Sequence, residues 1–222
     1  MCGRYTLLEE EAEIVEEFDL DTVIRDYEPR YNIAPGQKVL AIINDGKQKR
    51  AGYMYWGLVP SWAKDPKIGY KMINAKSETA HEKPSFKRLL SSKRCLIVAD
   101  SFYEWKKTES GKQPLRISSR NRKLFAFAGL WDHWKQDEEE RFTCTILTKE
   151  ANDFMSEIHS RMPVILPKDF EERWIEPVKW NAEEAHDFIE QLNMEDLQAY
   201  QVSQYVNSAK HTGPECIASI EG

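Results

Sequence analysis

The second residue of the chain is a cysteine, and this position gives it a chemistry that an internal cysteine lacks. The side chain of Cys2 is small enough to allow removal of Met1, which would leave Cys2 with a free α-amine beside its thiol. The pKa of an α-amine is about 8 and that of a thiol about 8.5, so both are partly deprotonated near neutral pH. Such an aminothiol attacks an aldehyde first through nitrogen, giving an imine, and then through sulfur, closing a five-membered thiazolidine. The sequence therefore predicts either an aldehyde trap or an N-terminal-nucleophile hydrolase.

The other cysteines, Cys95, Cys144 and Cys216, are widely spaced, and the sequence contains no CxxC pair. Cys95 and Cys144 lie in apolar, strand-like segments, where a thiol behaves as a small hydrophobic side chain. We therefore expect both to pack in the core. The spacing predicts no metal site, and we expect no cofactor.

Composition and charge narrow the class of protein. Hydrophobic residues make up 41% of the 222 residues and charged residues 31%, with a net charge of -6. No apolar run approaches the roughly 20 residues that span a bilayer, and no signal peptide is apparent, so we expect a cytoplasmic location, associated with the nucleoid if the protein binds DNA. The negative charge argues against indiscriminate coating of nucleic acid. One basic cluster exists, but charge alone favours a solvated face for it (Lys83, Lys87, Arg88, Lys93 and Arg94).

The secondary-structure elements that must position Cys2 are expected to be mostly short strands. The spacing of Thr6 and Glu9 suggests a capping box before a helix over residues 8–18. Asp45-Gly46 predicts a hairpin turn between two strands, and Asn181 with Glu184 predicts the cap of a helix reaching residue 192. Strands are also expected at 95–99, 102–105, 115–118, 124–131 and 142–147, helices at 151–158 and 170–174, and a final strand over 197–206. This order predicts a single α+β domain spanning residues 1–222, with a curved, mainly antiparallel β-sheet core and flanking short helices.

Six short motifs follow one another in order along nearly the whole chain, beginning at Cys2. They are Cys2-Gly3-Arg4-Tyr5, Tyr31-Asn32-Ile33-Ala34-Pro35, Trp56-Gly57-Leu58-Val59-Pro60, Asn74-Ala75-Lys76-Ser77-Glu78, Ala99-Asp100-Ser101-Phe102-Tyr103-Glu104-Trp105 and His159-Ser160-Arg161-Met162-Pro163-Val164-Ile165-Leu166. Together they closely resemble the SRAP (SOS response-associated peptidase) family of abasic-site-processing proteins.

The resemblance implies four catalytic residues. Cys2 would form the thiazolidine with the ring-opened sugar of an abasic site. Asn74 would orient the cysteine and sense the lesion through a neutral amide. Glu104, flanked by aromatic residues, would have a raised pKa and move protons during imine formation and ring closure. His159 would protonate the sugar ring oxygen and act again when the crosslink reverses.

The resemblance also implies a set of DNA contacts. Arg4 and Arg161 are candidates for phosphate binding, and Thr148 would add a hydroxyl contact. Pro35 and Trp62 match family positions that stack on or wedge against bases beside the lesion. Lys76 stands where the family usually has arginine, so an ammonium group replaces a guanidinium that can form two parallel hydrogen bonds with a phosphate. Val98 and Ser101 likewise replace a common proline and glycine near Glu104.

The implied activity is capture of abasic sites in single-stranded DNA through a reversible covalent bond to Cys2. Removal of Met1 would be autocatalytic or the work of an aminopeptidase, stalling at the imine would permit lyase activity, and a monomer is the simplest expectation. Two alternatives remain open. One is an amidohydrolase of the glutaminase type, and the other is a reader of damaged or modified bases that binds without a covalent bond.

Overall fold

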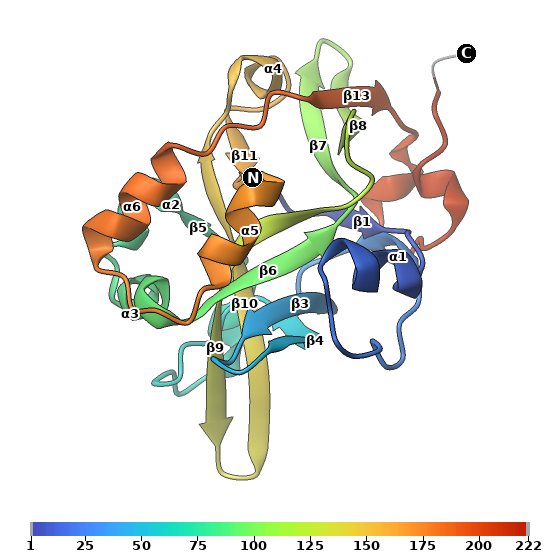
Figure 1. Ribbon diagram of the computed structural model, residues 1–222. Coiled ribbons are helices and arrows are strands. Elements are labelled where there is room, and N and C mark those ends of the chain that lie inside the picture. The colour runs from blue at the N-terminus through green and yellow to red at the C-terminus, as the bar shows by residue number, and fades with distance from the viewer. Residues whose placement is uncertain (1, 221–222) are drawn as a thin grey trace.

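Two β-sheets form the centre of the molecule in a computed structural model, which describes residues 2–220 (Figure 1). Met1, whose removal the sequence predicts, lies outside the described residues. The strands are β1 (Tyr5–Leu7), β2 (Arg30–Ile33), β3 (Lys38–Asn44), β4 (Lys49–Trp56), β5 (Asn74–Lys76), β6 (Arg94–Ala99), β7 (Ser101–Thr108), β8 (Gly111–Ser119), β9 (Phe125–Gln136), β10 (Glu139–Glu150), β11 (Arg161–Pro163), β12 (Ile165–Leu166) and β13 (Leu197–Gln201).

The larger sheet closes on itself. Its strand order is β11-β10-β4-β3-β6-β9-β12, with β5 paired to β10, and β10 also pairs with β9. Strands β10, β4, β3, β6 and β9 therefore form a ring in which each has two neighbours, as in a small barrel. The second sheet has the order β13-β8-β7-β1-β2. Among the described strands, β10 is parallel to β4 and β5, and the remaining pairs are antiparallel, which confirms the mainly antiparallel α+β core.

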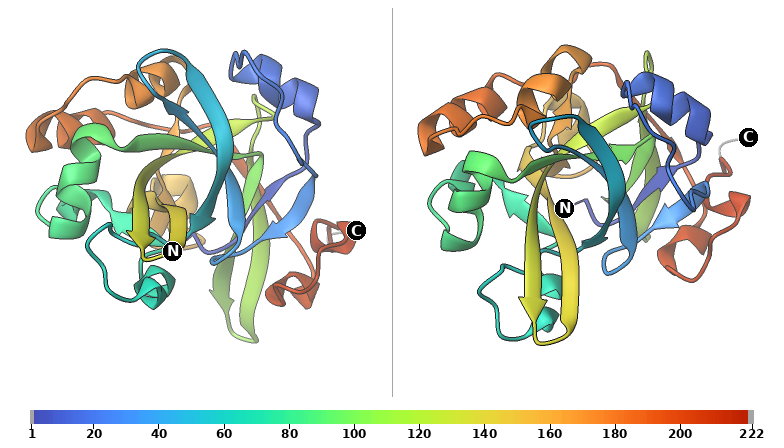
Figure 2. Two further views of the ribbon diagram at one scale, coloured as in Figure 1. Left: turned by 90° about the horizontal axis from the view of Figure 1, so that it is seen from below. Right: turned by 60° about the horizontal axis from the view of Figure 1, so that its bottom comes forward.

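Short helices cover the outside of the sheets. They are α1 (Glu11–Glu17), α2 (Ser77–Ala80), α3 (Pro84–Ser92), α4 (Asp153–Ser156), α5 (Lys168–Ile175) and α6 (Ala182–Glu190), with 3-10 turns η1 (Pro66–Lys71), η2 (Gln204–Asn207) and η3 (Pro214–Cys216). Figure 2 shows α3 and α6 on one side of the molecule and α1 with the C-terminal segment on the other, while the β9–β10 hairpin projects from the body (Figures 1 and 2). Among the described residues, no helix is both long and apolar enough to cross a membrane.

Local signals predicted several elements correctly. The hairpin around Asp45-Gly46 joins β3 to β4, and Asn181 caps α6 through a capping box with Glu184. The capping box at Thr6 was wrong: Thr6 lies in β1, where its hydroxyl bonds the carboxylate of Asp100, and Glu10 caps α1 instead. Pairing of β1 with both β2 and β7 overrides the local preference for a helix start.

Two other predicted elements are shorter in the structure, and one helix was missed. The helix expected at 151–158 is reduced to the single turn α4, and the strand expected at 197–206 ends at Gln201, before η2. Helix α3 was not predicted. Its apolar residues Phe86, Leu89 and Leu90 follow Pro84, a residue favoured in the first turn of a helix.

Tyr5 joins the two sheets beside the N-terminus. The ring of Tyr5 is fully buried, with its centroid 5.4 Å from that of Trp56 and 5.6 Å from that of Phe127. Because Trp56 and Phe127 belong to the barrel and Tyr5 to the smaller sheet, this contact fixes the start of β1 against the barrel. Cys2, three residues earlier, is thereby held close to the centre of the molecule.

Candidate active site

Cys2 is buried at the point where the chain enters β1. The side chain has no exposed surface, and its sulfur accepts a hydrogen bond from the backbone N–H of Arg4. Burial raises the pKa of the Cys2 thiol well above its usual range, and the negative charge of Glu104 adds to the rise. In this state the sulfur is a neutral thiol. Cys95 and Cys144 are buried as well, as the sequence predicts.

Glu104 reaches the site from β7. Successive side chains of a strand point to opposite faces, so Glu104 points away from its neighbours Tyr103 and Trp105. Only 3% of Glu104 is exposed, and this burial raises the pKa of its carboxyl, while the nearby His159 opposes the rise. The expected desolvation of Glu104 is therefore present. The charge of Glu104 interacts with Cys2 and with His159, so three of the four predicted catalytic residues lie near one another.

His159 follows α4 and is oriented by the strand that comes next. Its ring nitrogen Nδ1 accepts a hydrogen bond from the backbone N–H of Arg161 at 3.0 Å. In the neutral ring, accepting at Nδ1 leaves the proton on Nε2. Nδ1 also lies 3.2 Å from the carbonyl of Arg161, to which it would donate in the other tautomer, so the backbone of β11 orients the ring in either form.

Asn74 is placed by a parallel strand pair that the sequence did not predict. In β5, Asn74 lies opposite Ile146 of β10, followed by Ala75 opposite Leu147. Both polar atoms of the Asn74 side chain, Oδ1 and Nδ2, are buried and have no hydrogen-bond partner among the described residues. A buried amide without partners is costly, so this side chain is suited to a polar group that enters the site.

Arg161 is held by a carboxylate and by β10. Its guanidinium forms a bidentate ion pair with Glu78, at 2.5 and 3.0 Å, and donates to the carbonyl of Thr148 at 2.7 Å. Thr148 is fully buried and its hydroxyl also accepts from Arg161, at 3.2 Å. In this structure Thr148 therefore supports Arg161 and presents no surface of its own to DNA. Lys76, paired with Thr148 in the strand register, is exposed.

The two predicted stacking residues lie on surface turns. Trp62 is 60% exposed, which rules out simple core burial. Its loop is anchored on the barrel, because the N–H of Ser61 donates to Asp132 at 2.8 Å and Trp134 Nε1 donates to the carbonyl of Ala63 at 2.7 Å. Pro35 is half-buried in the turn between β2 and β3.

The basic cluster predicted around α3 does not form one surface. Arg94 is 5% exposed, and its guanidinium donates to five backbone carbonyls, including that of Trp174 at 2.6 Å. Arg88 pairs with the buried carboxylate of Asp132 at 2.9 Å. Arg94 is thus a structural residue that ties α3 to α5, and Arg88 is the cluster residue that forms an ion pair among the described residues.

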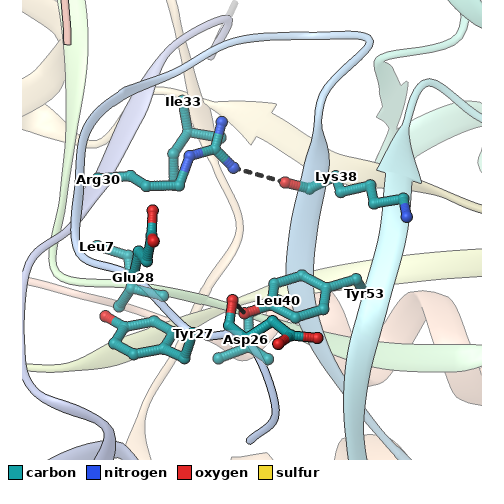
Figure 3. Close-up of a pocket in the computed structure, with 9 residues that line it drawn as sticks. All are labelled: Leu7, Asp26, Tyr27, Glu28, Arg30, Ile33, Lys38, Leu40 and Tyr53. Carbon is teal, nitrogen blue, oxygen red and sulfur yellow. Dashed lines mark hydrogen bonds between the residues drawn. The ribbon is translucent and has the colours of Figure 1, made fainter.

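A cavity of about 300 Å³ lies away from the predicted site residues. Figure 3 shows its lining, which combines Tyr27, Tyr53 and apolar side chains with Asp26, Glu28 and Arg30. Arg30 donates to the carbonyl of Lys38 at 2.6 Å, so its charge is already oriented within the wall. None of the ten predicted site residues lines this cavity. Among the described residues, no group of three or more histidine, cysteine or acidic side chains has the geometry of a metal site.

Two polar residues with clear structural roles at this site were missed. Glu78 pairs with Arg161 and belongs to the motif that begins at Asn74, so its charge and spacing could have identified it. Asn32 accepts a hydrogen bond from Arg4 at 2.9 Å across a separation of 28 residues, and only its place in a motif hinted at a role.

Comparisons with known proteins agree on one family. The family model for SOS response associated peptidase (SRAP) matches residues 1–209. The chain is 49% identical over 223 residues to the abasic site processing protein YoqW of Bacillus subtilis (strain 168), covering 99% of this chain and 100% of that protein. It is 34% identical over 228 residues to the abasic site processing protein HMCES of Gallus gallus, covering 88% of this chain and 67% of that protein.

Solved structures share the fold. A crystal structure of a protein from Bacteroides thetaiotaomicron matches with a TM-score of 0.87 and 22% identity, covering 98% of this chain and 99% of that one. At this identity the likeness shows the fold alone. A phage-related protein from Bordetella bronchiseptica matches with a TM-score of 0.74 and 30% identity, covering 91% of this chain and 95% of that one.

Proposed function

Because the chain belongs to the SOS response associated peptidase (SRAP) family, we propose that it captures abasic sites in single-stranded DNA through a covalent bond to Cys2. The names of its relatives in Bacillus subtilis and Gallus gallus describe abasic site processing. The observation that carries the proposal is the burial of both Cys2 and Glu104, with Glu104 close enough to interact electrostatically with Cys2 and with His159. These groups provide a nucleophile and two proton carriers at one place.

The reaction begins once Met1 has been removed. The α-amine of Cys2 attacks the aldehyde carbon of the ring-opened sugar, a C–N bond forms, and loss of one water gives an imine. The thiol sulfur then adds to the same carbon while its proton passes to the imine nitrogen, which closes the thiazolidine. Burial raises the pKa of the thiol, so the amine, with an ordinary pKa of about 8, is the better first nucleophile.

Glu104 moves protons between these steps. Burial raises the pKa of the Glu104 carboxyl, so it holds a proton more readily than an exposed carboxylate and is better suited to proton transfer. Glu104 would take the proton from the amine nitrogen, which becomes positively charged once it has bonded to the carbon, and return it to the departing hydroxyl. His159, whose ring is oriented by the backbone of Arg161 at Nδ1, would protonate the sugar ring oxygen from Nε2, which opens the hemiacetal to the aldehyde.

Asn74 would bind the sugar. Its amide offers one acceptor and two donor hydrogens, and its buried Oδ1 and Nδ2 atoms are unpaired among the described residues. A sugar hydroxyl, which both donates and accepts, would satisfy them. A sugar that still carries its base would bind Asn74 less well, because the base would keep the sugar from approaching the amide closely.

The DNA strand would cross the surface next to the nucleophile. The exposed ring of Trp62 and the turn at Pro35 would stack against bases that flank the lesion, a contact that reads no sequence. Arg4 and Arg161 would face phosphates, with Lys76 as an exposed point charge beside them. Two finer activities belong to the same proposal: autocatalytic removal of Met1, and strand cleavage when the reaction stops at the imine.

The proposal is tested by crosslinking under denaturing conditions. Wild-type protein mixed with a single-stranded oligonucleotide that carries one abasic site should give a shifted gel band that survives denaturation without borohydride. Cys2→Ser should give a shifted band only when borohydride reduces its imine. Cys95→Ser is the matched control, because Cys95 is also buried yet lies in β6 of the barrel, and it should crosslink like the wild type. A stable band from Cys2→Ala would overturn the proposal.

A further inference from the structure

Asn32 lies at the junction of three segments that are far apart in sequence. It belongs to β2, is 2% exposed, and its Oδ1 accepts from Arg4 Nη1 at 2.9 Å. Its Nδ2 group lies within hydrogen-bond distance of three backbone carbonyls of the C-terminal segment, which we define as residues 203–217. These carbonyls belong to Val206, Ser208 and His211, at 3.2, 3.0 and 2.9 Å. One buried amide therefore connects β2, the N-terminal residues and the C-terminal segment.

Arg4 is held by the same segment. Its Nη1 donates to the carbonyl of Val206 at 2.9 Å and its Nη2 to that of Asn207 at 3.3 Å. These partners and Asn32 are neutral, and Arg4 forms no ion pair with a carboxylate among the described residues. The surroundings therefore fix the orientation of the guanidinium and leave its positive charge uncompensated.

The backbone of Arg4 transmits this orientation to Cys2. The N–H of Arg4 donates to the sulfur of Cys2, and the carbonyl of Arg4 accepts from the N–H of Tyr103 at 2.9 Å. Tyr103 directly precedes Glu104 in β7. A shift of the Arg4 side chain would therefore displace the Arg4 backbone. That backbone binds the sulfur of Cys2 through its N–H and binds β7, the strand that carries Glu104, through its carbonyl.

The C-terminal segment is itself anchored to the opposite face of β7. The hydroxyl of Tyr103 donates to the carbonyl of Tyr31 at 2.8 Å, and Trp105 Nε1 donates to Asn207 Oδ1 at 2.7 Å. Tyr103, Val206 and Cys216 also share a small buried cluster. Since side chains alternate along a strand, Glu104 faces the nucleophile while its two neighbours hold the C-terminal segment.

We infer that Asn32 is a positioning residue for the Cys2 reaction: it holds Arg4 against the C-terminal segment, and Arg4 in turn holds the Cys2 sulfur and presents an uncompensated charge to a DNA phosphate. This inference rests on the proposed function. It assigns a role to the Tyr31–Pro35 motif, and it places the C-terminal segment among the parts that build the site.

Asn32→Asp tests the inference with little change in shape. The variant keeps an oxygen for Arg4, loses the amide that faces three carbonyls, and neutralises the Arg4 charge. Tyr103→Phe is the matched control, because it removes hydrogen bonds between β7 and the same region. It leaves the hydrogen bonds of the Arg4 guanidinium and the charge of Asn32 unchanged. Both proteins are first checked for folding by thermal denaturation and for loss of Met1 by mass.

Two readouts follow the DNA reaction. The crosslinking rate at limiting abasic oligonucleotide should fall about tenfold in Asn32→Asp, equivalent to about 1.4 kcal/mol. The slope of the logarithm of affinity against the logarithm of salt should become shallower by about 0.7, the loss of one phosphate contact to a single strand. Tyr103→Phe should keep the wild-type slope. Unchanged rate and slope in Asn32→Asp, or equal changes in both variants, would overturn the inference.

A third readout does not depend on DNA. Alkylation of Cys2 by iodoacetamide, followed by peptide mass, should become several-fold faster in Asn32→Asp, because the sulfur would lose its fixed partner. If wild-type protein forms no crosslink, the proposed function fails while this rate still tests the positioning of Cys2. If Asn32→Asp does not fold, Arg4→Lys replaces it. A lysine keeps the charge but cannot bridge Asn32 and the carbonyls, so alkylation should again be faster, and a wild-type alkylation rate would overturn the inference.

Discussion

The backbones of Gly57 and Gly69 are in close contact, and replacing either residue with alanine should show how much the stability of the protein depends on that contact. A Cβ on Gly57 would lie 2.7 Å from the carbonyl oxygen of Gly69 and 3.1 Å from its carbonyl carbon. Gly57 also has a φ of +136°, which L-residues rarely adopt. The backbone has little room to yield, because the N–H of Gly57 donates to Cys144 at 2.9 Å and that of Leu58 to Met72 at 3.1 Å.

The expected loss of stability in Gly57→Ala has two parts. Backbone strain at such a φ costs about 1–3 kcal/mol, and overlap with a fixed backbone a further ~1–3 kcal/mol, so we expect about 2–6 kcal/mol in all. Gly69→Ala meets the carbonyl oxygen of Gly57 at 2.7 Å but its φ lies outside the strained range, so only the second part applies. Gly52→Ala is the control, since its Cβ would meet nothing within 4 Å and a small gain is expected.

Urea denaturation of the three variants measures these differences, with equal m-values required for comparison. The order of stability should be Gly52→Ala above Gly69→Ala above Gly57→Ala. The folded fraction of Gly57→Ala should also crosslink more slowly, because Trp56 Nε1 donates to the carbonyl of Ile73 at 2.9 Å and so places the strand that begins at Asn74. A Gly57→Ala protein as stable as Gly52→Ala would refute this reasoning.

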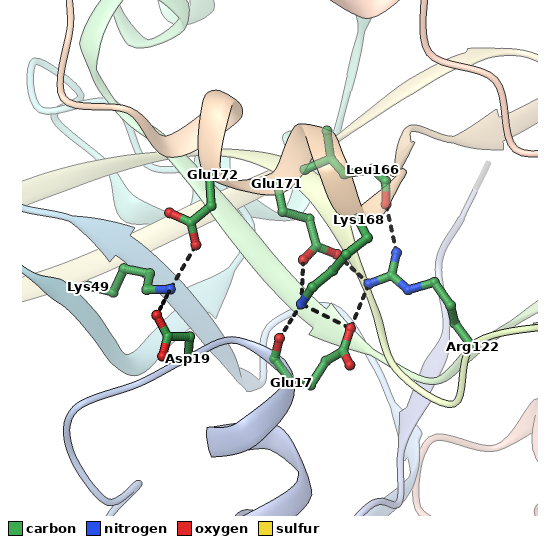
Figure 4. Close-up of polar contacts among 8 residues, drawn as sticks. All are labelled: Glu17, Asp19, Lys49, Arg122, Leu166, Lys168, Glu171 and Glu172. Carbon is green, nitrogen blue, oxygen red and sulfur yellow. Dashed lines mark hydrogen bonds and ion pairs between the residues drawn. The ribbon is translucent and has the colours of Figure 1, made fainter.

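Three further predictions concern charge and stacking. Because burial raises the pKa of Glu104 above its ordinary 4.5, the stability that it contributes is present below that pH and is lost as the pH rises through the folded-state pKa. Glu104→Gln should therefore be more stable than the wild type at pH 8 by thermal denaturation, while crosslinking slows by up to about 10²–10⁴-fold; an equal pH dependence of stability in the two proteins would contradict this. Trp62→Ala should keep the fold and weaken binding of abasic single strands by about 1–3 kcal/mol in a titration, and a loss below twofold would remove Trp62 from the interface. Figure 4 shows Arg122 paired with Glu17 at 3.0 Å and with Glu171 at 2.6 Å, and Glu171 is 3% exposed. Arg122→Met would leave the Glu171 carboxylate buried with Lys168 as its remaining cation at 3.4 Å, so urea denaturation should show a loss of about 3–5 kcal/mol in the free energy of unfolding. Lys123→Met removes the exposed pair between Lys123 and Glu13 and should be as stable as the wild type.

Local sequence signals predicted the elements whose stability is itself local. The Asp45-Gly46 turn and the Asn181 cap of α6 depend on residues within a few positions of each other. Thr6 failed for the opposite reason. Its hydroxyl bonds Asp100, 94 positions away, so a spacing typical of a helix cap became part of a strand.

Some features of the candidate site follow from local sequence, and others depend on contacts between residues that are far apart in the sequence. Cys2 stands out as a candidate nucleophile because its chemistry follows from its position, and the raised pKa of Glu104 could be predicted because its aromatic neighbours imply burial. The parallel pairing of β5 with β10, which leaves the Asn74 amide buried, could not be derived from three residues with no pattern of their own. The burial of Arg94 was equally hidden, since five backbone carbonyls from separate turns surround it.

The mass of the intact adduct tests the central claim most directly. Protein and a single-stranded oligonucleotide with one abasic site are mixed, denatured without borohydride and weighed. The account predicts a species whose mass is that of the chain without Met1, plus the oligonucleotide, minus one water, and fragmentation should place the DNA on Cys2. Protein that retains Met1, or that leaves the oligonucleotide unmodified, would contradict it.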